Sequence, residues 1–292
     1  MRKVNTMKLK GTSRQAGRKK GRSIPSIILL LIMGLFMLLP IYLTVVMSVK
    51  PVEELFVFPP QMYTLRPTLD NYKDMFDVLR SNRVPFSRYV FNSVAVTVTV
   101  TVLQCGFSAM AAFVLAKCKF PGGKIINSII VTSLLYQSNV IYIMQYIVMS
   151  EMGIIDTPLA LILPAIASPM GLFLMRQSIS QIPDSMIEAA KVDGAGLFRI
   201  CWQIVMPNQK PALMTIIIFA FQGAWNIQGG SVIFQEQYKT LPTVVSQAAS
   251  SGIARAGVAM AAAVFMLVPP VIVFILAQRQ VIETMAHSGI KE

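Results

Sequence analysis

Residues 256–278 read AGVAMAAAVFMLVPPVIVFILAQ, without a single Asp, Glu, Lys, Arg or His. A helix needs about 20 mostly apolar residues to cross the hydrocarbon core of a bilayer, and this stretch is long enough. Of the 292 residues in the chain, 54% are hydrophobic and only 13% are charged, whereas a soluble domain carries about 25% charged residues. The sequence therefore predicts an all-α membrane protein and argues against a soluble enzyme.

Uncharged runs of this kind, each 19 to 28 residues long, recur along the whole chain, and we expect each to form one transmembrane helix. Residues 94–102 alternate with the period of a strand, but a lone strand in lipid would leave backbone groups unpaired, which favours a helix. The run at 23–49 is longer than the apolar core of a signal peptide, so we expect it to remain as the first span. The six runs are 23–49, 89–116, 125–150, 157–175, 211–235 and 256–278.

The chain then divides into a basic tail at 1–22, a six-helix domain at 23–280 and a C-terminal tail at 281–292.

The basic residues gather on one side of this arrangement. Segments on that side hold 18 Lys or Arg and 5 Asp or Glu, a net charge of +13, while those on the other side hold 8 of each. Positive loops stay in the cytoplasm, so both termini are predicted to lie inside the cell. We interpret the tail as an orienting, lipid-binding segment and not as a nucleic-acid site. The positive side comprises 1–22, 117–124, 176–210 and 279–292.

The loop at 177–210 has the pattern of two short helices and not of a linker. Ser185 and Glu188 have the spacing of a capping box at a helix start, and Gly194 suits a left-handed helix end. Pro207 and Pro211 are expected to stop the second helix and to start the next span. Either the lipid headgroups or a partner protein would meet the exposed face of the first helix, which we expect to present Ile187, Ala189, Ala190 and Val192.

These residues carry a resemblance to a known family. Glu188-Ala189-Ala190, followed by Gly194 and then by Ile204-Val205-Met206-Pro207, resembles the EAA motif of bacterial ABC importer permeases, although Met206 replaces the family's Leu. Asp193 and Ala195 match the extended form of the motif. The maltose-type, carbohydrate-importing branch, which depends on a binding protein, is similar at Asn92-Ser93, Arg176 and Trp225-Asn226. The likeness covers residues 20 to 290 and implies the ABC type I importer architecture.

By this resemblance, the loop is the coupling helix that sits in a cleft of a cytoplasmic ATPase. Two alanines allow a close approach to a groove, and Glu188 is favoured near a helix start by the helix dipole. We expect Gly194→Asp to abolish transport without preventing membrane insertion. The ATPase-coupling residues implied are Glu188, Ala189, Ala190, Asp193, Gly194 and Pro207.

The chain lacks an ATP site of its own, because Cys118 stands where the P-loop pattern ending at Gly123-Lys124 requires its first glycine. We therefore expect a non-catalytic subunit that binds no cofactor, with ATP and Mg²⁺ held by a separate ATPase. Three unclustered cysteines and a single histidine, His287, also argue against a metal site. The partners implied are a second six-helix permease subunit, usually a paralogue, an ATPase dimer, an external solute-binding protein and membrane lipid.

Polar residues inside the runs mark either contacts between helices or a solute path. Gln222, Trp225 and Asn226 share one face of the fifth run, and Gln137 and Gln145 share a face of the third. Uncharged amides and an aromatic ring suit a neutral saccharide, so we expect an oligosaccharide as the solute.

Two alternatives remain open. The first is an importer of another solute, such as a polyol or phosphorylated polyol, and the second is a channel that conducts without ATP. A third alternative, an intramembrane protease acting through Ser231, fails because no His or acidic residue lies inside the runs to activate it. The loop at 228–255, by resemblance, reaches toward the solute-binding protein.

Overall fold

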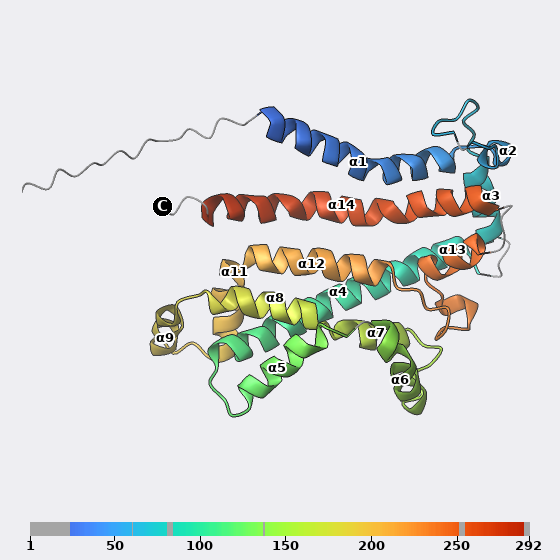
Figure 1. Ribbon diagram of the computed structural model, residues 1–292. Coiled ribbons are helices and arrows are strands. Elements are labelled where there is room, and N and C mark those ends of the chain that lie inside the picture. The colour runs from blue at the N-terminus through green and yellow to red at the C-terminus, as the bar shows by residue number, and fades with distance from the viewer. Residues whose placement is uncertain (1–23, 60, 81–83, 137, 251–254, 289–292) are drawn as a thin grey trace, which may run out of the picture. The chain divides into compact units, whose positions relative to one another are not determined.

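The computed structural model describes residues 24–59, 61–80, 84–136, 138–250 and 255–288, and every regular element in these ranges is a helix (Figure 1). In chain order the elements are α1 (Ile24–Ser48), α2 (Val52–Leu55), α3 (Asp70–Arg80), α4 (Phe86–Lys117), α5 (Gly123–Ser133), α6 (Ser138–Glu151), α7 (Leu159–Ile166), α8 (Pro169–Ser180), α9 (Asp184–Val192), α10 (Leu197–Arg199), the π-helix η1 (Ile200–Val205), α11 (Met206–Asn208), α12 (Lys210–Trp225), the 3₁₀-helix η2 (Glu236–Tyr238), α13 (Leu241–Ala249) and α14 (Ala256–Ser288).

The chain forms two units, one that ends at Leu43 and one that runs from Thr44 onward. The described part of the first unit is a continuous helix whose apolar side chains, such as Leu30 and Phe36, are exposed. A helix that is apolar all round belongs in a membrane or a large core. The residues of the basic tail at 1–22 lie outside the described ranges.

Four described helical stretches are long and apolar enough to cross a membrane. A fifth candidate is the pair 197–208 and 210–225, which is bent by 89°. The residues with period two, 94–102, lie inside α4, so the prediction of a helix there is confirmed. The four stretches are Ile24–Ser48, Phe86–Lys117, Leu159–Ser180 and Ala256–Gln278.

The expectation of a single helix at 125–150 is wrong. α5 ends at Ser133 and α6 begins at Ser138. The Ser133 hydroxyl donates to the Ile130 carbonyl over 2.7 Å, a bond by which serine competes with the helical ladder. The backbone continues in a tighter turn, in which the Tyr136 amide bonds to the Ser133 carbonyl at 3.3 Å. Four to five candidate spans are therefore described in place of six uninterrupted ones.

Two other predicted spans also differ from their uncharged runs. The run at 157–175 is divided into α7 and α8 at Ser168, which is extended before Pro169 and accepts the Gly171 amide as a helix cap at 3.1 Å. The fifth run is helical only as far as Trp225, where α12 ends. Finally, α14 continues to Ser288, beyond the domain boundary expected at residue 280.

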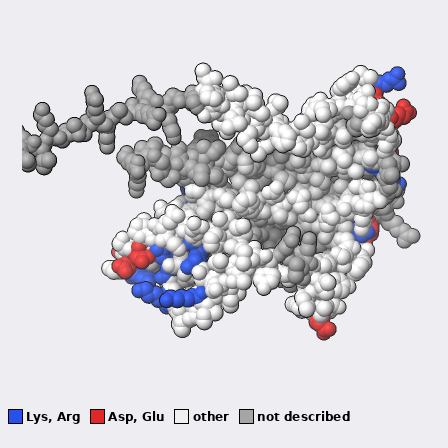
Figure 2. Space-filling view, in the orientation of Figure 1, with Lys and Arg blue, Asp and Glu red and all other residues white. Residues whose placement is uncertain are grey.

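The second unit is built around α4, which packs against α7, α8, α12 and α13. A buried apolar cluster, called here the inner cluster, joins the C-terminal half of α4 to α8, α12 and the segment from α9 to α11. On the face of this unit visible in Figure 2, charged side chains gather around α9 and at the opposite end of the spans, with uncharged surface between them. The inner cluster includes Ala109, Phe113, Met175, Ile179, Ile187, Ala190, Ile200, Val205 and Ile216.

α12 and α14 are joined by a hydrogen bond that a proline makes available. Pro270 has no N–H, so the carbonyl four residues earlier, that of Met266, loses its partner within α14. The Trp225 indole N–H donates to this carbonyl over 3.0 Å. A neighbouring helix thus satisfies the backbone group that the proline leaves unpaired, as membrane helices require.

Candidate functional site

The predicted helix–bend–helix is present at residues 184–208, which we call the helix–bend–helix segment. α9 is followed by Gly194 in the left-handed region, with φ of +79°, where a side chain is disfavoured. The Ala195 amide then bonds back to the Ala190 carbonyl at 3.0 Å, and α10, η1 and α11 form the second helical piece. The bend predicted at Gly194 is confirmed.

The predicted capping box is wrong. Pro183 is the residue before α9, no side chain caps the helix, and Ser185 already lies inside it. Asp184 is instead held by Lys117 of α4, whose ammonium lies 2.7 Å from the carboxylate and also donates to the Ile182 carbonyl. The hydrogen bond from Lys117, and then its charge, lower the pKa of Asp184. The ion pair therefore fastens the start of α9 to the end of α4.

The face of α9 that we expected to be free is partly buried. Ile187 and Ala190, which are 4% and 6% exposed, belong to the inner cluster. Glu188 and Ala189 are exposed, and Val192 is 88% exposed. The expectation that Ile187 and Ala190 face outward is therefore wrong, because a helix of nine residues packed on the chain's own core buries one side. Three other predicted coupling residues are exposed, namely Asp193, Gly194 and Pro207.

The second piece is also packed into the inner cluster. Ile200 and Val205 in η1 are fully buried in the inner cluster. As Pro207 and Pro211 predict, this piece ends between them, at Asn208, and the chain then turns by 89° into α12. At the turn, the Ser178 hydroxyl of α8 donates to the Gln209 side chain. Both halves of the segment are thus continuous with the packing of the spans.

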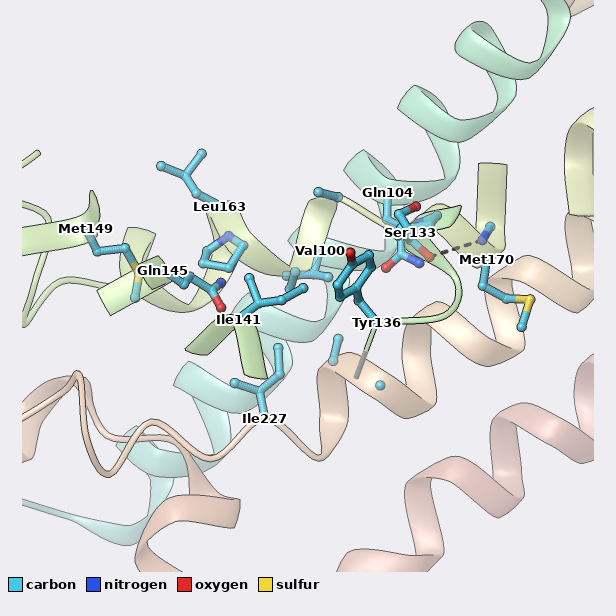
Figure 3. A pocket seen from close by; sticks show the side chains of 18 of the residues that line it. Val100, Gln104, Ser133, Tyr136, Ile141, Gln145, Met149, Leu163, Met170 and Ile227 are labelled. Carbon is cyan, nitrogen blue, oxygen red and sulfur yellow. Dashed lines mark hydrogen bonds between the residues drawn. The ribbon is translucent and has the colours of Figure 1, made fainter. Parts of the chain in front are cut away.

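The predicted path residues do not meet in one place. Gln145 lines a cavity of about 1140 Å³ between α4, α6, α7, α8 and α12, called here the main cavity (Figure 3). Gln222 and Asn226 line a smaller cavity of about 500 Å³ between α12 and α14. Gln137 lies outside the described residues. These residues therefore lie on different sides of α12.

Trp225 and Asn226 are engaged by the protein itself. The Trp225 side chain is 5% exposed, with its N–H on the Met266 carbonyl and its ring stacked on that of Phe221. The side-chain amide of Asn226 donates to the backbone carbonyl of Gln222 at 2.8 Å. The backbone N–H of Asn226 caps the C-terminal end of α12. In this conformation Trp225 joins two helices, and it offers a solute no polar group.

The loop between α12 and α13 is held in place by residues of α4. The Asn92 amide donates to the carbonyls of Gln237 and Lys239 at 2.8 and 3.0 Å. The Ser93 hydroxyl accepts the Leu241 amide at 2.7 Å. The residues that carried part of the resemblance, Asn92-Ser93, thus position this loop.

Asp156, which the sequence did not single out, holds the same loop from the other side. Its carboxylate accepts the amides of Phe234 and Gln235, each at 2.8 Å, and its own amide donates to the Val232 carbonyl. These hydrogen bonds, that from Gln235 first, lower the pKa of Asp156. Asp156 also has φ of +63°, which is uncommon outside glycine. The signal available was the short segment 151–156 between two uncharged runs, whose charged residues are both acidic, Glu151 and Asp156.

Gln104 is the other residue that the sequence did not single out. It lies on α4 and lines the main cavity. It was visible as one of two amides in the run 89–116. Among the described residues, no group of three or more His, Cys, Asp or Glu side chains is arranged to hold a metal ion.

Comparisons with known proteins agree with this arrangement. The chain is 27% identical over 286 residues to the sn-glycerol-3-phosphate transport system permease protein UgpE of Yersinia enterocolitica, covering 92% of this chain and 98% of that one. It is also 27% identical over 270 residues to the arabinooligosaccharides transport system permease protein AraQ of Bacillus subtilis, covering 89% and 93%.

The fold is shared with a chain of a bacterial ABC transporter involved in the import of the acidic polysaccharide alginate. The TM-score is 0.72 at 22% sequence identity, over 88% of this chain and 95% of that chain. A family model described as the inner membrane component of binding-protein-dependent transport systems matches residues 16–286. The chain therefore belongs to this family, as a multi-pass inner-membrane permease of an ABC importer with the type I fold.

Proposed function

We propose that the helix–bend–helix segment couples this permease to a separate ATPase. The observation that carries the proposal is the division of the segment into two faces. Ile187 and Ala190 are packed with α4, α8 and α12, whereas Glu188, Ala189 and Val192 are exposed. A force applied to the exposed face is transmitted to the spans because packed interiors do not deform easily.

The exposed face has the chemistry of a docking surface. Apolar side chains continue from Val192 across the bend to Phe198, which is 71% exposed and whose ring lies 6.3 Å from that of Trp202. Exposed aromatic residues are enriched at protein interfaces. Glu188 near the start of α9 supplies an anion for a basic group on the partner. Asp193, Gly194 and Pro207 complete the proposed set.

For the topology we propose six crossings with both termini in the cytoplasm. The crossings are α1, α4, α5 with α6, α7 with α8, α12 and α14. This arrangement places the loops with 18 Lys or Arg inside and those with 8 outside, in accord with the positive-inside rule. The segments at 1–22 and 281–292 are then cytoplasmic, and 177–210 is the loop that meets the ATPase.

An oligosaccharide is the proposed solute. Support comes from the likeness to a permease for arabinooligosaccharides and from the uncharged amides of Gln145, Gln222 and Asn226 that line the two cavities. Gln137 and Trp225 remain proposed path residues, the latter in a conformation that breaks its bond to Met266. The likeness to a glycerol-3-phosphate permease makes a phosphorylated polyol the second candidate.

The assembly needed for this function has four kinds of subunit. We propose a second permease subunit, a paralogue of this one, an ATPase dimer that binds ATP and Mg²⁺, and an external solute-binding protein that meets the loop held by Asn92 and Asp156. This chain is the non-catalytic part. Hydrolysis would move the helix–bend–helix segment and thereby switch the access of the path between the two sides of the membrane.

The test is ATP hydrolysis and solute uptake by the whole complex in proteoliposomes. The binding protein is loaded in turn with an oligosaccharide and with glycerol 3-phosphate. Stimulated hydrolysis together with uptake of the oligosaccharide supports the proposal, and selective uptake of glycerol 3-phosphate supports the second candidate. Solute flux through this chain without ATP would contradict coupling and favour a channel.

A further inference from the structure

The connection between α2 and α3 contains a run of apolar residues, most of which are exposed. Residues 55–65, called here the aromatic loop, read LFVFPPQMYTL and include no charged residue. The Phe58 side chain is 91% exposed. Exposed apolar side chains that occur together mark contact with a membrane or with another protein. The large exposed side chains of the loop are those of Phe56, Val57, Phe58, Met62, Tyr63 and Leu65.

The polar groups of the same segment are turned toward the chain itself. Lys50, only 3% exposed, donates from its ammonium to the Gln61 carbonyl over 2.9 Å. The Glu54 carboxylate accepts the Thr64 hydroxyl at 3.0 Å and the Leu65 amide at 3.4 Å. These polar groups satisfy one another inside the segment. The segment thus presents apolar side chains to its surroundings, which is the reverse of a loop that faces water.

Both ends of this segment are fastened to the end of α1. The Thr68 amide donates to the Val49 carbonyl over 2.8 Å. The Asn71 side chain, itself buried, donates to the carbonyls of Ser48 and Lys50 at 2.9 and 2.7 Å. Because Lys50 also holds the middle of the aromatic loop, the loop stays close to the residue at which α1 ends.

The length of α1 fixes the level of that residue relative to a membrane. α1 has 25 residues, which extend over about 37 Å at about 1.5 Å per residue, and the hydrocarbon core is about 30 Å thick. Since α1 crosses the whole core, Ser48 lies within about 8 Å of its edge, in the layer of the lipid headgroups. Aromatic side chains are enriched at this level in membrane proteins.

We propose that the aromatic loop is an interfacial anchor, which inserts Phe58 and its apolar neighbours among the phospholipids of the leaflet where α1 ends. Lipid is the partner that the observations favour, because the loop is fastened at its level and is itself uncharged. Arg66, the residue directly after the loop, is exposed and supplies a cation for lipid phosphate groups. The inference goes beyond the proposed function and depends on the crossing of α1, not on the solute or the ATPase.

The first experiment identifies what covers the loop. The photo-reactive residue benzoyl-phenylalanine is placed at position 58 and, as a control, at position 73, because Lys73 on α3 has an exposed, charged side chain. The whole complex, with its binding protein, is illuminated in vesicles of phosphatidylethanolamine and phosphatidylglycerol. Phospholipid adducts should be at least about five-fold more abundant at 58 than at 73, because only position 58 reaches the lipid.

The second experiment measures the depth of the loop in the same vesicles. Phe58→Trp and Lys73→Trp each add one fluorophore to the two native tryptophans, Trp202 and Trp225. Brominated acyl chains quench only those rings that reach them. The emission added by Phe58→Trp should therefore fall by about half or more, and that added by Lys73→Trp by less than about a tenth.

The outcomes separate this inference from the proposed function. Capture of the second permease subunit or of the binding protein at 58, in place of lipid, would show that a protein covers the loop and would overturn the anchor. Equal lipid adducts, or equal quenching, at positions 58 and 73 would overturn it as well. Uptake by the wild-type complex is measured separately, and its absence would remove the proposed function while the lipid adducts at 58 still support the anchor.

Discussion

Gly194 and Gly196 allow the bend in the helix–bend–helix segment to be tested with a matched pair of substitutions. Gly194 has φ of +79° and Gly196 has φ of −70°, and a Cβ atom added at either would meet no atom within 4 Å. Gly194→Ala therefore introduces left-handed strain of about 1–2 kcal/mol, and Gly196→Ala does not. The difference between the two variants isolates the backbone conformation from any steric effect.

The Ala195 amide reports on the strain, because it bonds across the bend to the Ala190 carbonyl. A cost of 1–2 kcal/mol changes an equilibrium constant by about 5- to 30-fold. In the assembled complex, hydrogen exchange at Ala195 should be faster by about this factor in Gly194→Ala and nearly unchanged in Gly196→Ala. ATP-driven uptake should fall in the first variant alone, because the bend sets the angle at which α9 meets its partner.

Two results would refute this reasoning. Equal exchange at Ala195 in the two variants would show that the left-handed conformation does not strain the segment. Faster exchange in Gly194→Ala with uptake as in Gly196→Ala would show that the angle of the bend has no part in coupling.

Three further predictions concern contacts that hold the loops and spans together. Because Lys117 lowers the pKa of Asp184, the ion pair stabilises the segment above the ordinary Asp pKa of about 3.9 and is lost as the pH falls through the lowered value. The protease resistance of residues 184–208 should then be constant from pH 8 to 5 and decline only below about pH 4. Lys117→Met should remove this decline. A decline near pH 6 would be inconsistent with stabilisation by the ion pair of Lys117 and Asp184. Asp156→Ala should speed hydrogen exchange in the loop between α12 and α13 and weaken the stimulation of ATP hydrolysis by the binding protein. Asp156→Asn, which keeps a hydrogen-bond acceptor and tolerates positive φ, should stay close to wild type. Identical behaviour of the two variants would count against the role of the Asp156 side chain in holding this loop. Trp225→Phe should destabilise the complex by about 1–3 kcal/mol, by leaving a carbonyl of α14 unpaired, and Pro270→Ala should offset part of this loss by restoring the helical hydrogen bond; additive effects of the two substitutions on Tm would refute the link.

The distribution of charge in the sequence was enough to predict the helical class and the position of most spans. The breaks within the spans were harder to predict from the sequence. The break after Ser133 depends on a local hydroxyl bond, and Ser133 looks like any other polar residue in an apolar run. The break at Ser168 was signalled by Pro169, but prolines also occur within intact membrane helices, as Pro269 and Pro270 do in α14.

Residue pattern also predicted the bend at Gly194 but not the face that α9 exposes. Helical spacing says which residues share a side, and only packing decides which side is buried, so Ala190 was assigned to the wrong one. Trp225 illustrates the same limit, because its partner carbonyl lies 41 residues away.

The central claim is that the exposed face of α9 meets the ATPase, and a photo-cross-linking residue at position 192 tests it most directly. Val192 projects outward and is 88% exposed, and Ile143 on α6, 70% exposed, serves as the control position. In a complex that is active in import, the probe at 192 should be joined to the ATPase subunit and the probe at 143 should not. Active import with no ATPase captured at 192 would contradict the account.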